Sequence, residues 1–255
     1  MSLILSALPG IPLIRHGDNL AQILLKGVRA AGLALEDGDI LVLAQKIVSK
    51  AEGRMVDLAT IHPGRKAHAL AKSTGKDPRL LELMLQESTA VLRTRPGTII
   101  VEHRLGFICA NAGIDHSNVA GEGSAAGEWV LLLPEDPDRS ARAIREELET
   151  SSRKKIGVMI IDSHGRAWRM GTVGVAIGLS GLPGVVDLRG GKDLFGYTLR
   201  VTQVGAADEL AAAASLVMGQ AAEATPAIHV RGYPYPLREA SLGELIRPKG
   251  EDLFR

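Results

Sequence analysis

KIGVMIIDSHGRAWRMG, residues 155–171, is the segment around which the rest of the chain is organised. Its apolar and mostly β-branched run, residues 156–161, predicts a buried strand. Asp162, Ser163 and His164 follow where such a strand leaves the core, and carboxylate and hydroxyl oxygens side by side suit Mg²⁺ or Mn²⁺. An Asp that only caps a strand-to-turn junction explains the same pattern. The stretch alone therefore leaves a metal ligand and a structural cap both open.

The residues after this strand add two further features. Arg166 and Arg169 could hold phosphate or carboxylate, and a structural salt bridge explains either arginine equally well. Farther on, GTVGVAIGLSGL repeats glycine among small apolar residues. This pattern predicts close approach of the backbone to another element or to a ligand.

The composition of the chain argues against several classes of function. Thirty Lys and Arg against 29 Asp and Glu give a net charge of +1, and aromatic residues make up 3% of the 255 residues. No overall field attracts nucleic acid or an anionic membrane, so an anionic ligand must be held by local charges. The amino-terminal sequence has no signal-peptide pattern, and no stretch reaches the roughly 20 apolar residues of a membrane span. We therefore expect a cytoplasmic protein that binds neither nucleic acid nor membrane.

Cys109 is the only cysteine of the chain. An intrachain disulfide and a cysteine-based zinc site are therefore both excluded within one chain. In its context, GFICANAG, a buried small thiol is favoured over a nucleophile.

Two segments near the amino terminus are candidates for binding a nucleotide. LPGIPLI, residues 8–14, is a stiff apolar loop that can pack against a flat ring, and an edge strand with a turn explains it as well. A predicted strand over residues 40–44 runs into QKIVSKAEGR, where Gln45, Lys46 and Lys50 cluster at a strand end of the kind that binds ligands in open α/β sheets. Lysine commonly binds phosphate, although two solvated lysines are equally ordinary on a surface.

A second oxygen-rich loop, NAGIDHSNV, follows an apolar segment and carries Asp115 and Asn118. Turn chemistry alone enriches the same residue types, so this loop is also open to a structural explanation. The next segment, AGEGSAAG at residues 120–127, predicts a mobile loop beside a site or a tolerated insertion.

The rest of the chain predicts interleaved helices and strands. Helices are expected from a cap at Asp18, over residues 63–87, over PEDPDRSARAIREELE and over the Ala-rich ADELAAAASLVMGQAAE. Strands are expected near the amino terminus, twice within residues 93–110, over 129–133, over 198–204 after a hairpin, and over 227–233. Neither a Walker A motif nor G-x-G-x-x-G follows a strand, so a P-loop or Rossmann nucleotide site is not expected.

Six motifs in this order resemble the coenzyme F420-0:L-glutamate ligase family, also called the F420 gamma-glutamyl ligase family. They are AQKIVSKAEGR, NAGIDHSNV, LLLPEDPDRSA, IIDSHGRAWRMG, GYTLRVTQVGAADELAAAA and IHVRGY. The resemblance runs from about Leu8 to the carboxyl terminus and implies an α+β fold of mixed sheets with packed helices, unlike the P-loop and Rossmann folds. It also implies a homodimer. We expect a single ligase domain over residues 1–255, with two intimately packed lobes as the alternative.

The resemblance further implies the residues of the site. Asp115 and Asp162 match the first divalent metal site, and Ser163 and Gln203 match the second, with Mg²⁺ or Mn²⁺ as the ions and K⁺ left open. Lys50 joins the two acids in the catalytic set. The residues that match GTP contacts are Ile11, Pro12, Leu13, Ile14, Gln45, Lys50 and Asn118.

The implied reaction joins the amino group of L-glutamate to a carboxylate on the deazaflavin coenzyme precursor F420-0. Hydroxide is a poor leaving group from a carboxylate, so transfer of the GTP γ-phosphoryl group would form an acyl phosphate and release GDP. Attack by the glutamate amine then releases phosphate. Such chemistry needs charge neutralisation on the phosphates more than a protein nucleophile.

Two departures from the family pattern keep alternatives open. Ser163 stands where threonine is usual, which keeps the oxygen ligand, whereas Gly174 stands where we expect many relatives to carry an Asp, so one acid near the site is missing. The first alternative is a GTP-dependent carboxylate-amine ligase of the same family with a different acceptor. The second is a non-catalytic module that binds nucleotide and metal.

Overall fold

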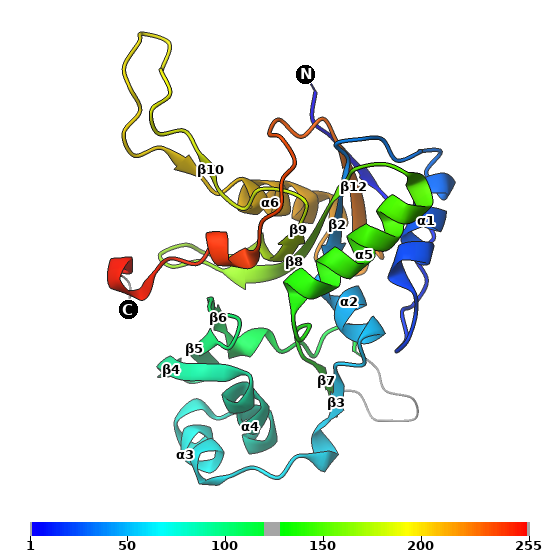
Figure 1. The fold of residues 1–255 in the computed structure, drawn as a ribbon. Helices are drawn as coiled ribbons and strands as arrows, with labels where there is room; N and C mark the ends of the chain where they lie inside the picture. Colours follow the sequence, from blue (N-terminus) through cyan, green and yellow to red (C-terminus); the bar gives the residue numbers. More distant parts are fainter. Residues whose placement is uncertain (1, 120–127, 254–255) are drawn as a thin grey trace.

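The computed structural model describes residues 2–119 and 128–253, so the loop predicted at residues 120–127 lies outside the described residues. A five-stranded mixed sheet with strand order β1-β12-β2-β8-β9 forms the centre of the fold (Figure 1). Its strands are β1 (Ile4–Ala7), β2 (Ile40–Ala44), β8 (Gly157–Gly165), β9 (Thr172–Ser180) and β12 (Ala227–Arg231). β2 and β8 run parallel, and the other neighbouring pairs are antiparallel. The carboxyl ends of β2 and β8 therefore meet at one edge of the sheet.

Helices cover both faces of this sheet because successive residues of a strand point to opposite sides. Leu41 and Leu43 belong to a core with α1 and α5, whereas Ile40 and Val42 belong to a core with α6. The three helices are α1 (Leu20–Ala30), α5 (Pro137–Ser152) and α6 (Ala206–Met218). Both faces are buried, which explains why the strand sequences are apolar throughout rather than alternating.

A second packed unit is inserted between β2 and α5. The chain leaves the sheet through α2 (Gln45–Ala51) and β3 (Met55–Asp57), and it returns through β7 (Trp129–Leu131), which pairs with β3. This unit has a core of its own, and Figure 1 shows it below the central sheet. Its other elements are α3 (Arg65–Thr74), α4 (Pro78–Gln86), β4 (Ser88–Arg95), β5 (Thr98–His103) and β6 (Ile108–Ala110). A single ligase domain, with two packed lobes as the alternative, stays a prediction.

An arm projects from the body of the protein between β10 (Val186–Asp187) and β11 (Gln203–Val204) (Figure 1). We call residues 188–202 the arm. The predicted hairpin is present, although its named ladder is two residues long on each side. Gln203 pairs with Asp187 at the base of this arm.

The α+β class with mixed sheets and packed helices is confirmed, and four local predictions need correction. β8 continues to Gly165 because β9 pairs with it that far, so Asp162 lies inside the strand. Asn19 caps α1, because its side chain accepts from the Gln22 backbone N–H while Asp18 accepts from Arg15. The region 63–87 forms two helices, since Gly75 ends the first in a left-handed conformation (φ 69°), and the region 93–110 contributes to three strands.

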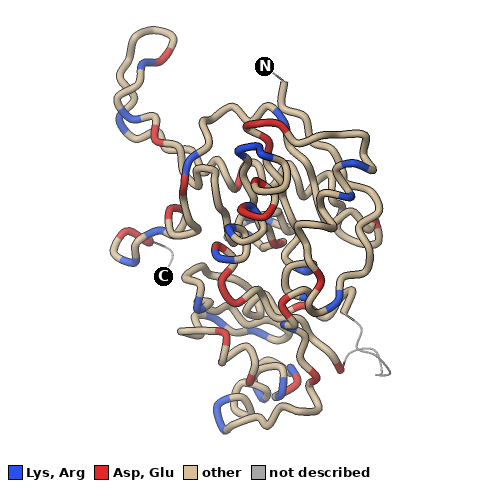
Figure 2. Tube along the Cα trace, turned by 45° about the vertical axis from the view of Figure 1, so that its right-hand side comes forward, with Lys and Arg blue, Asp and Glu red and all other residues tan. Residues whose placement is uncertain are grey.

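Charged residues of both signs are interspersed over the whole trace (Figure 2). No helix among the described residues is long and apolar enough to cross a membrane. Carboxyl-terminal residues also tie the two packed units together, because Lys249 Nζ lies 2.8 Å from Glu102 Oε1 on β5.

Candidate active site

The candidate active site lies at the edge where β2 and β8 end. Ala44, the last residue of β2, pairs with Ile161 of β8, so Gln45 and Asp162 each follow one member of that pair. Parallel strands bring their carboxyl ends to the same edge, and α2 begins there with Gln45 and Lys46. The edge is therefore polar although both strands are buried.

Asp115 is held at this edge by two side chains of α2. Gln45 Nε2 donates to Asp115 Oδ2 at 2.6 Å, and Lys46 Nζ lies 2.6 Å from the same oxygen. Gln45 is buried, and its Oε1 accepts from Ser49 Oγ at 2.8 Å. That bond fixes the amide so that its NH₂ group faces Asp115.

The loop before Asp115 adopts an unusual backbone. Asn111, Ala112 and Gly113 all have positive φ angles, of 53°, 54° and 64°. Left-handed backbone is uncommon for non-glycine residues and clusters at functional sites. A side chain at Gly113 would approach Leu133 Cδ1 within 2.7 Å, so this position requires glycine. The loop then returns to regular pairing, because Asp115 and the neighbouring strand residue Leu131 exchange backbone hydrogen bonds of 3.0 and 2.9 Å.

The surroundings of Asp115 raise the pKa of its carboxyl group and so disfavour its charged form. Burial raises the pKa of Asp115, the Lys46 ammonium opposes this rise, and the nearby Asp162 carboxylate adds to it. A second cation, Lys50, lies one turn along α2, and its Nζ donates to the Asn118 carbonyl at 2.7 Å. Burial lowers the pKa of Lys50, and Lys46 lowers it further. No carboxylate of the described residues forms an ion pair with Lys50, so this cation is available to an anionic ligand.

Asp162 extends the site along β8. His164 Nε2 lies 3.1 Å from Asp162 Oδ2, and both side chains are largely buried. The imidazole of His164 packs at a tilt against Phe107, with 5.2 Å between ring centroids, and Phe107 stacks on His103 at the same separation. This row of rings joins the edge of the sheet to the second packed unit. Such neighbours hold a carboxylate in one orientation.

Ser163 points to a partner that the sequence patterns did not single out. Its hydroxyl donates to Gln220 Oε1 at 2.8 Å, and Gln220 Nε2 donates to Ser215 Oγ at 2.7 Å. The next residue is also in contact, since Asn118 Nδ2 donates to the Ala221 carbonyl at 3.3 Å. The segment after α6 therefore closes over the edge. Its sequence signal is Gly219, which ends α6 with a φ of 74°.

The loop of residues 11–14 lies against the opposite end of α2. Ile14 is buried, whereas the Leu13 side chain is 91% exposed, so an apolar group is presented to solvent. The loop is anchored just beyond, where the Gly17 backbone N–H donates to the Ala51 carbonyl at 2.9 Å. Ile11 packs on the core and Pro12 is exposed. The loop and Lys50 thus share α2 as their support.

Most of the predicted site residues share this edge, and Gln203 does not. It is exposed at the base of the arm, and no hydrogen bond or ion pair within the described part of the chain links it to Asp162 or Ser163. Cys109 is 6% exposed, and burial raises its pKa to about 12, so the thiol is a core group rather than a nucleophile. Each role assigned to a site residue stays a prediction.

Close packing against α6 explains why glycine occupies position 174. Gly174 pairs with Ser163 across the β8–β9 ladder, and a Cβ there would lie 2.5 Å from the Ala211 carbonyl oxygen. A further contact of 2.6 Å would form with Ser215 Cβ. Close approach of the backbone, predicted from the glycine repeat, is confirmed here. An Asp at this position would push α6 away from the sheet.

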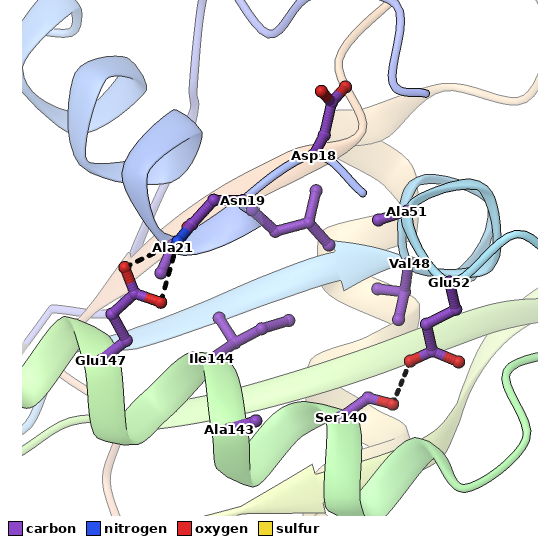
Figure 3. Close-up of a pocket in the computed structure, with 11 residues that line it drawn as sticks. Asp18, Asn19, Ala21, Val48, Ala51, Glu52, Ser140, Ala143, Ile144 and Glu147 are labelled. Carbon is purple, nitrogen blue, oxygen red and sulfur yellow. Dashed lines mark hydrogen bonds between the residues drawn. The ribbon is translucent and has the colours of Figure 1, made fainter. Parts of the chain in front are cut away.

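A hollow of about 260 Å³ lies elsewhere, where α1, α2 and α5 meet (Figure 3). Glu147 accepts hydrogen bonds from Asn19 across it, and Glu52 pairs with Ser140 at its other end. None of the site residues predicted from the sequence lines this hollow. The polar edge of β2 and β8 is the better candidate because it gathers the acids, the lysines and the left-handed loop.

The donor set of the edge fits a hard divalent cation that is only partly held by protein. Two carboxylates, Asp115 and Asp162, lie close enough for the charge of Asp162 to raise the pKa of Asp115, and oxygen ligands of this kind are those of Mg²⁺ and Mn²⁺. Ser163 is the next residue of β8, so its hydroxyl points to the other face of the strand, where it contacts Gln220. Among residues 2–119 and 128–253 there is no group of three or more His, Cys, Asp or Glu that could hold a metal. Such an ion would therefore need further ligands from substrate phosphates or water, which is usual for Mg²⁺.

Comparison with known proteins supplies the family. The model of the F420-0:gamma-glutamyl ligase family matches residues 10–232. The chain is 46% identical to the coenzyme F420:L-glutamate ligase of Methanothermobacter thermautotrophicus over 257 residues, which cover 100% of both chains. It is 42% identical to the enzyme of that name from Methanocaldococcus jannaschii, over 96% of this chain and 94% of the relative. It is also 40% identical to that of Methanosarcina mazei, over 98% and 94%. The chain belongs to the F420-0:gamma-glutamyl ligase family.

Proposed function

We propose that this protein joins the amino group of L-glutamate to a carboxylate of the deazaflavin precursor F420-0, with GTP as the activating co-substrate. Its relatives carry the name coenzyme F420:L-glutamate ligase over the full length of the chain. The observation that carries the proposal is the pairing of Asp115 with Lys46 beside Asp162, at the edge where β2 and β8 end.

The residues of this edge have distinct roles in the proposal. Lys50 binds phosphate oxygens, because it is half-buried, points toward the Asn118 loop and pairs with no carboxylate of the described residues. Residues 11–14 cover the nucleobase, with the exposed Leu13 as an apolar contact. Gln45 orients Asp115 through its fixed amide. Asn118 contributes from the opposite loop.

Asp115 and Asp162 would hold one divalent metal ion, and Ser163 and Gln203 are kept as the proposed ligands of a second. Burial already raises the pKa of Asp115, so this acid gains from a cation placed near it. Bound Mg²⁺ or Mn²⁺ would neutralise charge on the transferring phosphoryl group. The Ser163 hydroxyl donates a hydrogen bond to Gln220 Oε1, which leaves the lone pairs of the Ser163 oxygen free to face a ligand. We propose Gln220 as a positioning residue for Ser163. A role for K⁺ is kept as an open part of the proposal.

The reaction has two steps. A carboxylate oxygen of the acceptor attacks the γ-phosphorus of GTP, the bond to the β–γ bridging oxygen breaks, and GDP leaves. The neutral amine of L-glutamate then attacks the acyl phosphate carbon, the C–O bond to phosphate breaks, and the amine loses a proton as the amide forms. Positioning and charge stabilisation carry such chemistry. Lys50 and Lys46 are the side chains of this edge that supply positive charge for the phosphates.

The test is product formation with matched omissions. Phosphate release is measured with GTP, Mn²⁺, L-glutamate and F420-0, and the product is weighed by mass spectrometry. We expect phosphate only when all four are present, with a product heavier by one or more glutamyl units. Phosphate release with other carboxylic acids, and none with F420-0, would favour the ligase with a different acceptor. If no phosphate is released with any acceptor, the proposed ligase activity is wrong and the non-catalytic module that binds nucleotide and metal is favoured.

We also propose that the protein works as a homodimer joined through the arm. The arm exposes large apolar side chains: Leu194 is 97%, Phe195 95% and Val201 85% exposed. It stands away from the body of the chain (Figure 1). Apolar groups clustered on a projecting hairpin are typical of a surface that another copy covers.

Light scattering after size-exclusion chromatography tests the dimer. Phe195→Asp should shift the protein from dimer to monomer, because a charge would be buried in the contact. Arg200→Ala, which changes an exposed charged side chain of the same arm, should leave the dimer intact. A monomeric wild-type protein, or a dimer unaffected by Phe195→Asp, would contradict this part of the proposal.

A further inference from the structure

The turn between β8 and β9, residues 165–171, is not explained by the fold. Trp168 is 90% exposed and Met170 is 94% exposed. The turn is drawn away from the sheet on the side of the molecule where the arm projects (Figure 1). Burying an apolar side chain is favourable, and here two large ones are left in water. Exposed apolar groups that occur together mark binding sites.

The backbone of this turn sharpens the question. Trp168 has a φ of 62°, in the left-handed region that disfavours bulky side chains. Glycine at this position would remove both the strain and the exposed ring. The turn itself therefore does not need an indole. Residues held in this region occur often at ligand contacts.

Two arginines flank the indole. Arg166 and Arg169 are exposed, and neither forms an ion pair with a carboxylate within the part of the chain that the structure describes. Arg166 Nη2 donates to the Met170 carbonyl at 3.2 Å, which orders the turn and leaves most guanidinium donors free. A structural salt bridge, the competing explanation of these arginines from the sequence, is not formed within residues 2–119 and 128–253. A planar ring and two free guanidinium groups thus share one turn.

The turn continues directly from the active-site strand. β8 and β9 pair from Asp162 with Val175 to Gly165 with Thr172, immediately before the turn begins. At about 3.3 Å per residue, the start of the turn lies roughly 10 Å from Asp162 and its tip no more than roughly 20 Å away. A molecule that reacts at Asp162 and extends along the hairpin would meet Trp168.

We propose that this turn is the acceptor-recognition element: the Trp168 indole stacks on the fused ring system of the deazaflavin, and Met170 packs at its edge. Arg166 and Arg169 bind anionic groups of the acceptor, while its reacting carboxylate lies at the edge with Asp115 and Asp162. The proposal rests on the function proposed above. A deazaflavin is a flat, extended aromatic system, which matches stacking on an exposed indole, and a carboxylate acceptor matches paired arginine charges.

The test measures acceptor binding apart from catalysis. F420-0 is titrated into the full chain without GTP, and the Kd is compared for wild type, Trp168→Gly, Trp168→Phe and the double variant Arg166→Ala with Arg169→Ala. Removing one aromatic stacking partner weakens binding by about 10- to 100-fold. We expect that loss for Trp168→Gly, a smaller loss for Trp168→Phe and a salt-dependent loss for the arginine variant. Leu253→Ala, at an apolar residue 90% exposed near the carboxyl terminus, is the matched control.

Two further readouts separate recognition from folding. Trp168→Gly should unfold at the same or a higher temperature than wild type, because glycine relieves the φ of 62°. In turnover, the KM for F420-0 should rise while the KM for GTP stays unchanged. Unchanged Kd and KM in both Trp168→Gly and the arginine variant, or no F420-0 binding by wild type, would overturn the proposal. If F420-0 binds in a way that depends on Trp168 but no glutamylated product forms, the proposed reaction is wrong while the turn is still the element that recognises the acceptor.

Discussion

The two ends of the central sheet hold aspartates under opposite electrostatic conditions. At the amino end of β2, Asp39 is buried, and it accepts from His229 Nε2 at 2.8 Å and from Arg231 Nε at 2.9 Å. A third donor is the Glu36 backbone N–H at 2.8 Å. Burial alone would raise the pKa of Asp39, but the bonds from Arg231 and His229 hold it well below its usual value.

At the carboxyl edge of the same sheet, the acids are less completely satisfied. Burial raises the pKa of Asp115 in spite of Lys46, and Asp162 has a neighbouring histidine rather than an arginine fork. A carboxylate that is fully bonded stabilises the fold, whereas one kept short of partners is prepared to bind a cation. The comparison separates a structural acid from functional acids on one pair of strands.

The largest expected effect is on stability at the amino end. Asp39→Asn removes the buried carboxylate that Arg231 and His229 contact and leaves Arg231 only the exposed Glu36 as a counter-charge, so it should lower the free energy of unfolding by about 3–5 kcal/mol. Urea denaturation followed by circular dichroism measures this loss. Asp37→Asn, at a neighbour whose side chain is 66% exposed, should cost much less, because the Asn amide oxygen can still accept from the Lys155 backbone N–H and the pair with Lys154 is a surface one. If the two variants are equally stable, Asp39 is not the structural acid that the comparison makes it.

The next effect is on activity at the carboxyl edge. Asp162→Ala should abolish metal-dependent turnover of GTP, a loss of at least about 10²- to 10³-fold, because a preorganised electrostatic group is removed. Its melting temperature in the absence of metal should remain close to that of wild type. Phosphate release and thermal unfolding are measured on the same preparations, with Asp37→Asn as the control. A well-folded variant with wild-type activity would refute the site.

Lys50→Ala should have a smaller and more selective effect. Loss of one charge-assisted hydrogen bond to phosphate should weaken GTP binding by about 10- to 100-fold. Binding of L-glutamate should be nearly unchanged. Calorimetric titration of both ligands decides this, and Lys72→Ala, on the exposed side of α3, is the matched control. If Lys50→Ala weakens the binding of GTP and of L-glutamate equally, Lys50 is not a phosphate-binding residue.

The smallest effects are in the pH dependence, where the two acids should act with opposite signs. The lowered pKa of Asp39 means that its stabilisation is present above the unfolded pKa of about 3.9 and is lost as pH falls toward its folded pKa. The raised pKa of Asp115 means that its contribution is fully present below about 3.9 and is lost as pH rises through its folded pKa. Unfolding of Asp39→Asn and Asp115→Asn from pH 3 to 8 without metal compares the two. If the stability change caused by each variant varies with pH in the same direction, the distinction between a structural Asp39 and a functional Asp115 is wrong.

Local pattern was sufficient for the buried strands and for most helices. The strand over residues 40–44 is confirmed residue for residue, because a short apolar run between turns allows few other structures. The strand predicted over residues 198–204 is wrong except for its last two residues, because the preceding ones belong to the projecting arm. The boundaries were less certain. Asn19 rather than Asp18 caps α1, since both side chains can accept a backbone hydrogen bond and only the path of the loop chooses between them.

The site was only partly visible in the sequence. Asp115 and Gln45 are 70 residues apart in the chain, and nothing local indicates that they touch. Gln203, predicted as a metal ligand together with Ser163, lies at the base of the arm and stays a prediction, and within this chain Ser163 contacts Gln220, which no sequence pattern indicated. The reason is topological: α6 crosses the sheet and returns Gln220 to the edge, while β11 belongs to a separate ladder.

The amino-acid sequence alone indicates which strands are buried, which acids and lysines follow them, and which glycines allow close packing. Tertiary structure decided which of these groups meet, because the parallel register of β2 and β8 sets the common edge and the return of the chain through Asn118 and Gln220 closes it. It also decided that Arg166, Arg169 and Trp168 face solvent and that neither arginine forms an ion pair among the described residues. Burial and pairing depend on distant segments, so no local pattern could settle them.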